Sequence, residues 1–391
     1  MKHDLRKIFG SFLADGSFLK AETYGSGHIH DTFRITTEEK EKDDYILQRL
    51  NSNVFRRIPE LQENIERVTN HIRSKLAAIP GADLKRECIN MIPAKNGKSW
   101  INDDEGNFWR LLVFIPDHRS YDIVDSREKA KEGGRAVGRF QAMLADMPGP
   151  PLHETIPDFH NVEKRLEWFE DSVALDKAGR VAGLKREIEF FRERADKVTI
   201  IRKLGREGRI PVRITHNDTK FNNILLDEND KALCIIDLDT VMPGYVHYDF
   251  GDAIRTAANV AAENEKDLAK IRMDIGLFGA YAEGYLSETR ETLNSTEKEY
   301  LAFGPLLITY EQALRFLTDY IDGDVYYRIH HEHHNLQRTR AQIRLCLLYT
   351  SDAADDLPCV DLGGRRIIKK KKNAPPQFNT QTKKLIRIKA Q

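Results

Sequence analysis

The sequence predicts an α+β protein with two lobes, a small antiparallel sheet followed by a larger, mainly helical part. Between residues 19 and 115, short segments with strand-like apolar alternation surround one amphipathic helix, which is typical of a small sheet with one helix. From about residue 127 the apolar side chains recur at helical spacing, and short strands return only between 212 and 236. A chain of 391 residues is long enough for two such lobes.

The first strands are expected on either side of a glycine turn. Residues 24–28 contain two glycines, residues 32–36 alternate as a strand does, and residues 45–50 follow a charged turn. A helix comes next, because apolar residues between Leu61 and Leu76 form one stripe that ends at Pro80-Gly81.

A hairpin and a last strand complete the predicted sheet. Residues 89–94 and 99–101 flank an Asn-Gly turn at 96–97, and the apolar run 108–115 stops at Pro116. Further helices are expected at 127–147, 161–176, 181–204, 262–287, 296–321 and 333–345.

Polar residues with a specific spacing follow the strand at 212–215. Asp218 lies in the loop after it, Asn223 comes five residues later, and Asp237 closes the strand at 233–236. Phosphoryl transfer from ATP needs a carboxylate that accepts the acceptor's proton and oxygen ligands that hold Mg²⁺. Asp218 suits the first role, and Asn223 and Asp237 suit the second.

This spacing resembles the catalytic and metal loops of the protein-kinase-like fold. The resemblance implies that Lys220 contacts the transferring phosphate and that Asp239 assists the metal ion. Further residues are expected to bind the nucleotide. The glycine turn would contact its phosphates, a residue of the strand at 45–50 occupies the position of the usual kinase lysine, and the hinge would contact adenine. They are Gly25, Gly27, Gln48, Phe114 and Ile115.

Longer segments narrow the resemblance to the aminoglycoside phosphotransferase superfamily. Residues 216–227, 235–244 and 248–255 carry it, and residues 45–48 and 315–326 are most similar to N-acetylhexosamine 1-kinases. The implied activity is transfer of the ATP γ-phosphoryl group, with Mg²⁺, to the anomeric hydroxyl of N-acetylglucosamine or N-acetylgalactosamine. The substrate-contacting positions it implies are His28, Arg315 and Tyr326. One departure is His30, where that family typically has asparagine.

Two other functions stay open at this stage. Another small-molecule kinase of the same fold could act on an aminoglycoside, choline or homoserine, although a polycationic acceptor would favour an acidic cleft. An inactive kinase-like binding protein is the other alternative, and the intact Asp218, Asn223 and Asp237 argue against it.

The protein is expected to be cytoplasmic, and the charge of its last 46 residues differs from that of the rest of the chain. Residues 346–391 hold ten of the 61 Lys and Arg but four of the 61 acids, which leaves 51 basic and 57 acidic residues before them. An acidic body gives no electrostatic reason to expect nucleic-acid binding. No signal sequence or membrane span is expected, and the four widely spaced cysteines are expected to be reduced.

The predicted organisation is a nucleotide-binding lobe at 1–117, a catalytic and substrate lobe at 118–345, and a tail at 346–391. The tail lacks periodicity and resembles translated sequencing-adapter read-through joined to a truncated gene, so it is expected to be non-native and disordered. The protein is expected to be a monomer whose partners are ATP and a small sugar.

Overall fold

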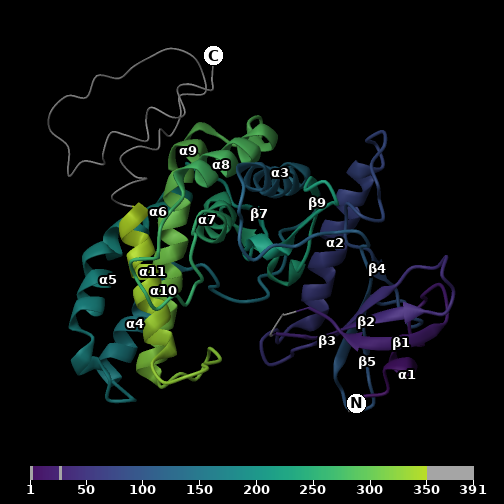
Figure 1. Ribbon diagram of the computed structural model, residues 1–391, viewed down its shortest axis with the longest axis horizontal. Helices are drawn as coiled ribbons and strands as arrows, with labels where there is room; N and C mark the ends of the chain where they lie inside the picture. Colours follow the sequence, from purple (N-terminus) through teal and green to yellow (C-terminus); the bar gives the residue numbers. More distant parts are fainter. Residues whose placement is uncertain (1–2, 26–28, 350–391) are drawn as a thin grey trace. The chain divides into compact units, whose positions relative to one another are not determined.

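The computed structural model describes residues 3–25 and 29–349, and its backbone forms two compact units (Figure 1). The sheet unit consists of Met1–Ser120, Met143–Pro157 and Ile224–Pro243, and the helical unit consists of the remaining segments. The sequence suggested one boundary, after residue 117. The structure instead adds two later segments to the sheet unit, because residues 143–157 and 224–243 pack with it.

The main sheet of the sheet unit has the strand order β1-β2-β3-β6-β4, with β5 paired to β6, and the pairs between successive strands are antiparallel. A separate hairpin joins β8 to β9. The elements are α1 Leu5–Phe9, β1 Phe18–Thr23, β2 Asp31–Thr37, β3 Tyr45–Leu50, α2 Ile58–Leu76, β4 Met91–Ile92, β5 Ile101–Asn102, β6 Phe108–Val113, β8 Ile224–Leu226, β9 Ala232–Ile235, η3 Leu238–Thr240 and β10 Met242–Gly244.

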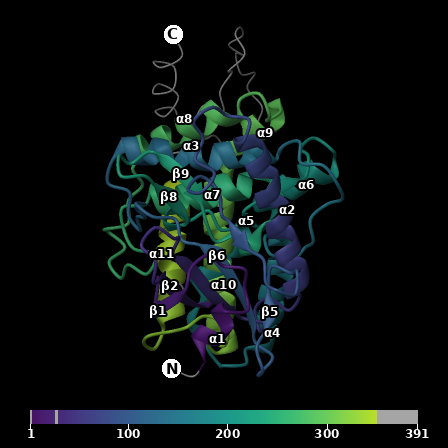
Figure 2. The ribbon, with the colours of Figure 1, turned by 90° about the vertical axis from the view of Figure 1, so that its right-hand side faces the viewer.

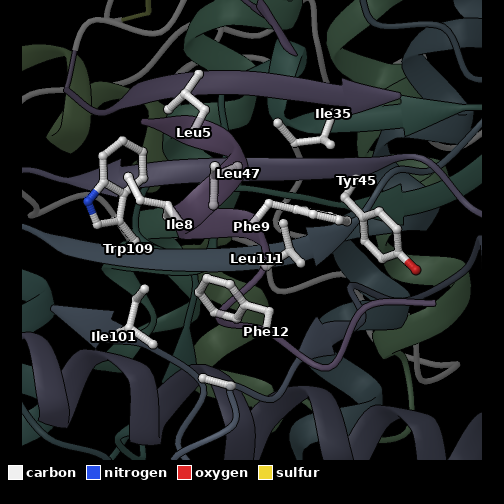
Figure 3. Close-up of a cluster of buried hydrophobic side chains, with 11 residues drawn as sticks. Leu5, Ile8, Phe9, Phe12, Ile35, Tyr45, Leu47, Ile101, Trp109 and Leu111 are labelled. Carbon is white, nitrogen blue, oxygen red and sulfur yellow. The ribbon is translucent and has the colours of Figure 1, made fainter. Parts of the chain in front are cut away.

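One face of this sheet is covered by α1 and forms an apolar core (Figures 2 and 3). Side chains two residues apart on a strand point to the same face, which places Tyr45 with Leu47 and Trp109 with Leu111 in this core. The alternate residues of these strands therefore point to the opposite face. Among them, Gln48 of β3 pairs in register with Arg110 of β6. This second face carries the polar network described below.

The helical unit contains most of the helices. Its elements are α3 Arg127–Leu144, which ends two residues outside the unit, α4 Val162–Leu175, η1 Val181–Gly183, α5 Lys185–Val198, α6 Ile200–Arg206, β7 Arg213–Thr215, η2 Phe221–Asn223, α7 Val246–Ala257, α8 Ile275–Thr289, α9 Ser295–Tyr300, η4 Leu301–Phe303, α10 Gly304–Asp322 and α11 His334–Leu348. The α+β class, with an antiparallel sheet in the N-terminal region and helices after it, is confirmed.

Helix α10 is the centre of the helical unit and packs against α4, α7 and α11 (Figure 1). Its approach to α7 depends on two glycines. A Cβ atom at Gly251 would lie 2.4 Å from the carbonyl oxygen of Gly304, a distance that no side chain can occupy. The pair therefore sets how closely α7 lies to α10, and α7 carries the residues that hold the loop after β7.

Several predicted helices are shorter than expected, for local reasons. Helix α8 begins at Ile275 because the Asp274 side chain accepts hydrogen bonds from the backbone N–H of Gly276 and Leu277. The predicted helix at 181–204 is divided at Thr199 into α5 and α6.

The predicted start of the tail at residue 346 is wrong. Helix α11 continues to Leu348, Cys346 is 1 % exposed and Tyr349 is 3 % exposed. These residues are part of the apolar interior of the helical unit, because the helical spacing from Ala341 and Leu345 continues into them. The rest of the predicted tail, residues 350–391, lies outside the described residues.

We expect truncation after Leu345 to destabilise the protein. It removes the buried side chains of Cys346 and Tyr349, and loss of such packing costs about 2–4 kcal/mol in free energy of unfolding. Truncation after Tyr349 is the matched control, and its composition-based expectation is a change within about 1 kcal/mol. Urea unfolding of both variants measures the difference; equal stabilities would show that the end of α11 adds nothing.

Candidate active site

The loop after β7 is held by one buried carboxylate. Asp249 of α7 accepts hydrogen bonds from the backbone N–H of His216 at 2.8 Å and of Asn217 at 2.7 Å, and from the side-chain nitrogen of Gln141 at 2.6 Å. Asp249 is fully buried, and burial raises its pKa although these donors oppose the shift. The bonds fix two consecutive peptide groups directly before Asp218.

Asn217 brings the chain into the turn that presents Asp218. Its φ of 67° lies in the left-handed region, which asparagine tolerates better than most residues. Its side-chain oxygen accepts a hydrogen bond from the Thr215 hydroxyl at 2.9 Å, and its side-chain nitrogen donates to the Thr215 carbonyl at 3.2 Å. The unusual backbone conformation is therefore stabilised locally.

The structure brings Asp218, Lys220 and Asn223 together. The Lys220 ammonium lies 2.9 Å from one Asp218 oxygen and 3.2 Å from the other. Burial raises the pKa of Asp218, but the Lys220 charge and its hydrogen bond outweigh burial and hold this pKa below its usual range. Asp218 is thus a carboxylate at neutral pH, which is the form that can accept a proton.

Asp218 also orients the side chain of Asn223. Its side-chain nitrogen donates to the Asp218 carbonyl oxygen at 2.8 Å and lies 3.4 Å from a carboxylate oxygen of Asp218. Its amide oxygen, the atom that a magnesium ion binds, accepts no hydrogen bond from the described part of the chain. The amide oxygen of Asn223 is therefore suited to bind a hard cation such as Mg²⁺.

The predicted metal residues Asp237 and Asp239 belong to the sheet unit. Asp237 follows β9 by two residues and adopts a left-handed φ of 62°. Its role as a magnesium ligand stays a prediction, which rests on the sequence pattern.

Asp239 belongs to a buried ionic network of the sheet unit. Both of its oxygens bind the Arg110 guanidinium, and one of them also bonds His30 Nε2 at 2.6 Å. Burial raises the pKa of Asp239, but the Arg110 and His30 contacts outweigh it and lower this pKa strongly. Asp239 is 3 % exposed and is paired with a buried cation in this structure, and its role as an auxiliary to the metal site stays a prediction.

Gln48 belongs to the same network. Its side-chain oxygen accepts from Arg110 Nε at 2.8 Å, and its nitrogen donates to the Thr32 hydroxyl at 3.0 Å. His30 in turn accepts from the backbone N–H of Asn51 at 3.0 Å through Nδ1. Gln48 orients Arg110 in this structure, and its contact with a nucleotide stays a prediction.

The predicted hinge and glycine turn meet within the sheet unit. The Phe114 ring lies 5.6 Å from the Tyr24 ring, next to Gly25, whose φ is 78°. The Phe114 N–H donates to the Asp44 carbonyl at 2.9 Å, and the Ile115 carbonyl accepts from His118 Nδ1 at 2.6 Å. These two backbone groups are thus already used, so adenine recognition by Phe114 and Ile115 would require their other groups. Gly27 and His28 lie outside the described residues.

Arg315 and Tyr326 line one cavity of about 400 Å³ in the helical unit. Asp319 accepts hydrogen bonds from the backbone N–H of Tyr326 at 2.7 Å and of Tyr327 at 3.0 Å, which fixes the segment after α10 beside the cavity. The charged residues that line it balance in number: Arg165, Lys177, Arg315, Asp171, Asp319 and Asp322.

Three residues that contact the loop after β7, directly or through another side chain, could not be predicted from the sequence. Asp249 lies in the segment 248–255, which carries the family resemblance. The spacing of that segment gives no sign that Asp249 binds the loop at 216–217. His160 contacts the loop at Asn217, and Glu311 contacts His160. Both residues are distant from the loop in sequence and approach it only in the folded protein. No local pattern identified them.

A carboxylate, a lysine and an asparagine on one loop, in a chain with an antiparallel sheet and a helical part, are the arrangement expected of a kinase-type phosphotransferase. Comparison with known families agrees. The model of the phosphotransferase enzyme family, APH, matches residues 20–291, and the chain belongs to this family.

Solved structures share the fold at low sequence identity. A microcompartment-associated aminopropanol kinase has a TM-score of 0.59 at 14 % identity, over 88 % of this chain and 95 % of that one. An aminoglycoside phosphotransferase from Alicyclobacillus acidocaldarius has a TM-score of 0.56 at 9 % identity, over 88 % and 93 %. The amicoumacin kinase in complex with AMP-PNP, Ca²⁺ and Ami has a TM-score of 0.55 at 12 % identity, over 88 % and 93 %.

Two features are absent from the described residues. Within residues 3–25 and 29–349, no helix is both long and apolar enough to cross a membrane. In the same part of the chain, no three His, Cys, Asp or Glu side chains form a group that could hold a metal ion. Kinases commonly bind Mg²⁺ through one or two carboxylates together with substrate phosphates, so a three-residue group is not required.

We expect Asp218→Asn to lower kcat by at least about 10², because an amide cannot accept the acceptor's proton. ATP affinity should change little, since this side chain acts on the acceptor and not on the nucleotide. Steady-state kinetics with ATP and acceptor varied separately measures both. Asp122→Asn is the control, because Asp122 bonds Asn222 of the same loop. Wild-type turnover in Asp218→Asn would remove Asp218 as the base.

Proposed function

We propose that the protein is an ATP- and Mg²⁺-dependent kinase that phosphorylates the anomeric hydroxyl of N-acetylhexosamines. The observation that carries this proposal is the cavity of the helical unit, which Arg315 and Tyr326 line together. These are the two described positions at which the sequence resembles the sugar contacts of N-acetylhexosamine 1-kinases. Family membership supports phosphoryl transfer, and the cavity supports this choice of acceptor.

The cavity suits an uncharged, hydroxyl-rich acceptor. Its three acids and three cations balance, and two of the acids are already engaged: Asp319 by backbone N–H groups and Asp322 by the Ser172 hydroxyl at 3.1 Å. A polycation such as an aminoglycoside would favour an excess of available carboxylates. Hydroxyl and acetamide groups instead pair with the donors and acceptors that a balanced cavity presents.

Two guanidinium groups favour recognition of carbonyl and hydroxyl oxygens. Arg165 lies over the Trp168 ring at 4.9 Å, and its Nε is buried without a hydrogen-bond partner in the described structure. Burial, and then the charge of Arg315, lower the pKa of Arg165. An acceptor oxygen bound in the cavity would reduce the repulsion between the two arginines.

The catalytic steps follow from the loop of the helical unit. Asp218 would accept the proton of the anomeric hydroxyl, and Lys220 would stabilise negative charge on the transferring group. Asn223 and Asp237 are the residues proposed to hold Mg²⁺, which when bound neutralises charge on the phosphates. The low pKa of Asp218 keeps it ready as a base at neutral pH.

A kinase for an amino alcohol is the second candidate. The observation in its favour is that Asp171, Asp319 and Asp322 line the same cavity, and carboxylates could bind an ammonium group. The aminopropanol kinase of the same fold has such a substrate in its name.

An ADP-release assay over a panel of acceptors tests the proposal. The panel contains N-acetylglucosamine, N-acetylgalactosamine, glucosamine, choline, 1-amino-2-propanol and kanamycin. We expect turnover with the two N-acetylated sugars and little with the amines. Preferred turnover of choline or aminopropanol would replace the proposal by the second candidate, and turnover of none would refute both.

Arg315→Ala tests how the acceptor is bound. Removing the guanidinium would leave acceptor oxygens unpaired in a partly dry site, which costs about 1–3 kcal/mol. We therefore expect KM for the sugar to rise about tenfold or more, with KM for ATP nearly unchanged. Arg340→Ala is the control, since Arg340 of α11 pairs with Glu187 and does not line the cavity. A rise in KM for ATP instead would place Arg315 at the phosphates.

A further inference from the structure

His160 bridges the loop of Asp218 and helix α10. It lies just before α4, and its side chain is 8 % exposed. Its Nε2 is 3.1 Å from the carbonyl oxygen of Asn217, and its Nδ1 is 3.0 Å from a carboxylate oxygen of Glu311. Asn217 immediately precedes Asp218, and Glu311 is one helical turn before Arg315.

Both partners of the imidazole accept hydrogen bonds. A neutral histidine has one N–H, so it can donate to one of them only, whereas an imidazolium donates to both. Glu311 is 1 % exposed, and a carboxylate so deeply buried needs a cation or several donors. The geometry therefore favours an ion pair between His160 and Glu311.

The other groups around the imidazole do not reverse this conclusion. The charged and titratable side chains that face it are Glu311 and Arg315 from α10 and Tyr248 from α7, whose ring centroid is 5.0 Å away. Burial lowers the pKa of His160, but the charge and hydrogen bond of Glu311 outweigh burial and raise this pKa above its ordinary value. Burial likewise opposes the ionised form of Glu311, and His160 outweighs it.

We propose that His160 is a positioning residue for phosphoryl transfer: as an imidazolium held by Glu311, it fixes the Asn217 carbonyl and thereby aims Asp218. The inference rests on the proposed function in that Asp218 is the base. Together with Asp249, which holds the N–H of Asn217, it fixes this residue from two sides. Because Glu311 and Arg315 are on one helix, the cavity and the base share one support.

Loss of the imidazolium proton has a defined consequence. In the neutral form the remaining proton stays on Nδ1, since the buried carboxylate is the stronger acceptor. Nε2 then presents a lone pair to the Asn217 carbonyl, and the loop is released. A raised pKa means that this support is complete below the ordinary histidine value and is lost as pH rises through the raised value.

Glu311→Gln separates the charge from the contact. A glutamine amide can donate to Nδ1, so a neutral His160 keeps its proton on Nε2 and still binds the carbonyl. We expect this variant to keep most of the wild-type kcat and to lack the loss of kcat at high pH that His160 deprotonation causes in the wild type. His160→Gln should lower kcat about 10- to 100-fold, because a displaced base is misaligned. Neither KM should change much.

His247→Gln is the control for removing a buried imidazole. His247 is fully buried, and its Nε2 lies 3.1 Å from the carbonyl oxygen of Glu297, so it contacts neither Asn217 nor Glu311 through this atom. It should leave the pH profile of kcat unchanged. An unchanged kcat in His160→Gln, or a high-pH loss that persists in Glu311→Gln, would overturn the positioning role.

Nuclear magnetic resonance of the imidazole tests the charge without any turnover. The His160 signal, identified by its absence in His160→Gln, should be that of an imidazolium at neutral pH, and Glu311→Gln should lower its pKa by at least about one unit. A neutral imidazole in the wild type would overturn the ion pair. Absence of turnover with every acceptor would refute the proposed function and leave this result intact. If His160→Gln does not fold, the pH profile of kcat in Glu311→Gln decides.

Discussion

The Asp249 carboxylate is the constraint on which the candidate active site depends. It accepts the backbone N–H groups of His216 and Asn217 and is itself held by Gln141, so the two peptides before Asp218 cannot rotate independently. Because Gly251 and Gly304 let α7 lie close to α10, Asp249 is fixed by packing as well as by hydrogen bonds. Buried contacts within the helical unit thus fix the orientation of the main chain that carries Asp218.

Helix α10 connects this loop to the cavity that we propose for the acceptor. Its Glu311 holds His160 at the Asn217 carbonyl, and Arg315, one turn later, lines the cavity with Tyr326. The sheet unit has its own buried ionic network, in which Arg110 and His30 bind Asp239 while Gln48 orients Arg110. The first network holds the loop before Asp218 in place. The second joins strands β3 and β6 to the segment after β9.

Local pattern predicted the parts of this protein that are encoded locally. The predicted strands at 45–50 and 108–115 are present as β3 Tyr45–Leu50 and β6 Phe108–Val113, and Asp218, Lys220 and Asn223 of the predicted loop lie together. The partners of these residues depend on the fold, since Arg110 and Asp239 are 129 residues apart. The ion pair of Asp239 could not be predicted, because a carboxylate after a strand looks the same in sequence whether it meets a metal ion or an arginine. The boundary after Leu345 failed because abrupt changes in composition outweighed a helical spacing that continues to Leu348.

Amide hydrogen exchange at His216 and Asn217, compared between the wild type and Asp249→Asn, tests the central claim most directly. An asparagine can accept only one of the two N–H bonds, so its other side-chain atom repels the second peptide. We predict strong protection of both amides in the wild type, and in the variant a loss of protection at one or both together with a matching fall in kcat. Unchanged protection, or lost protection with full turnover, would contradict the claim that Asp249 sets the position of the base.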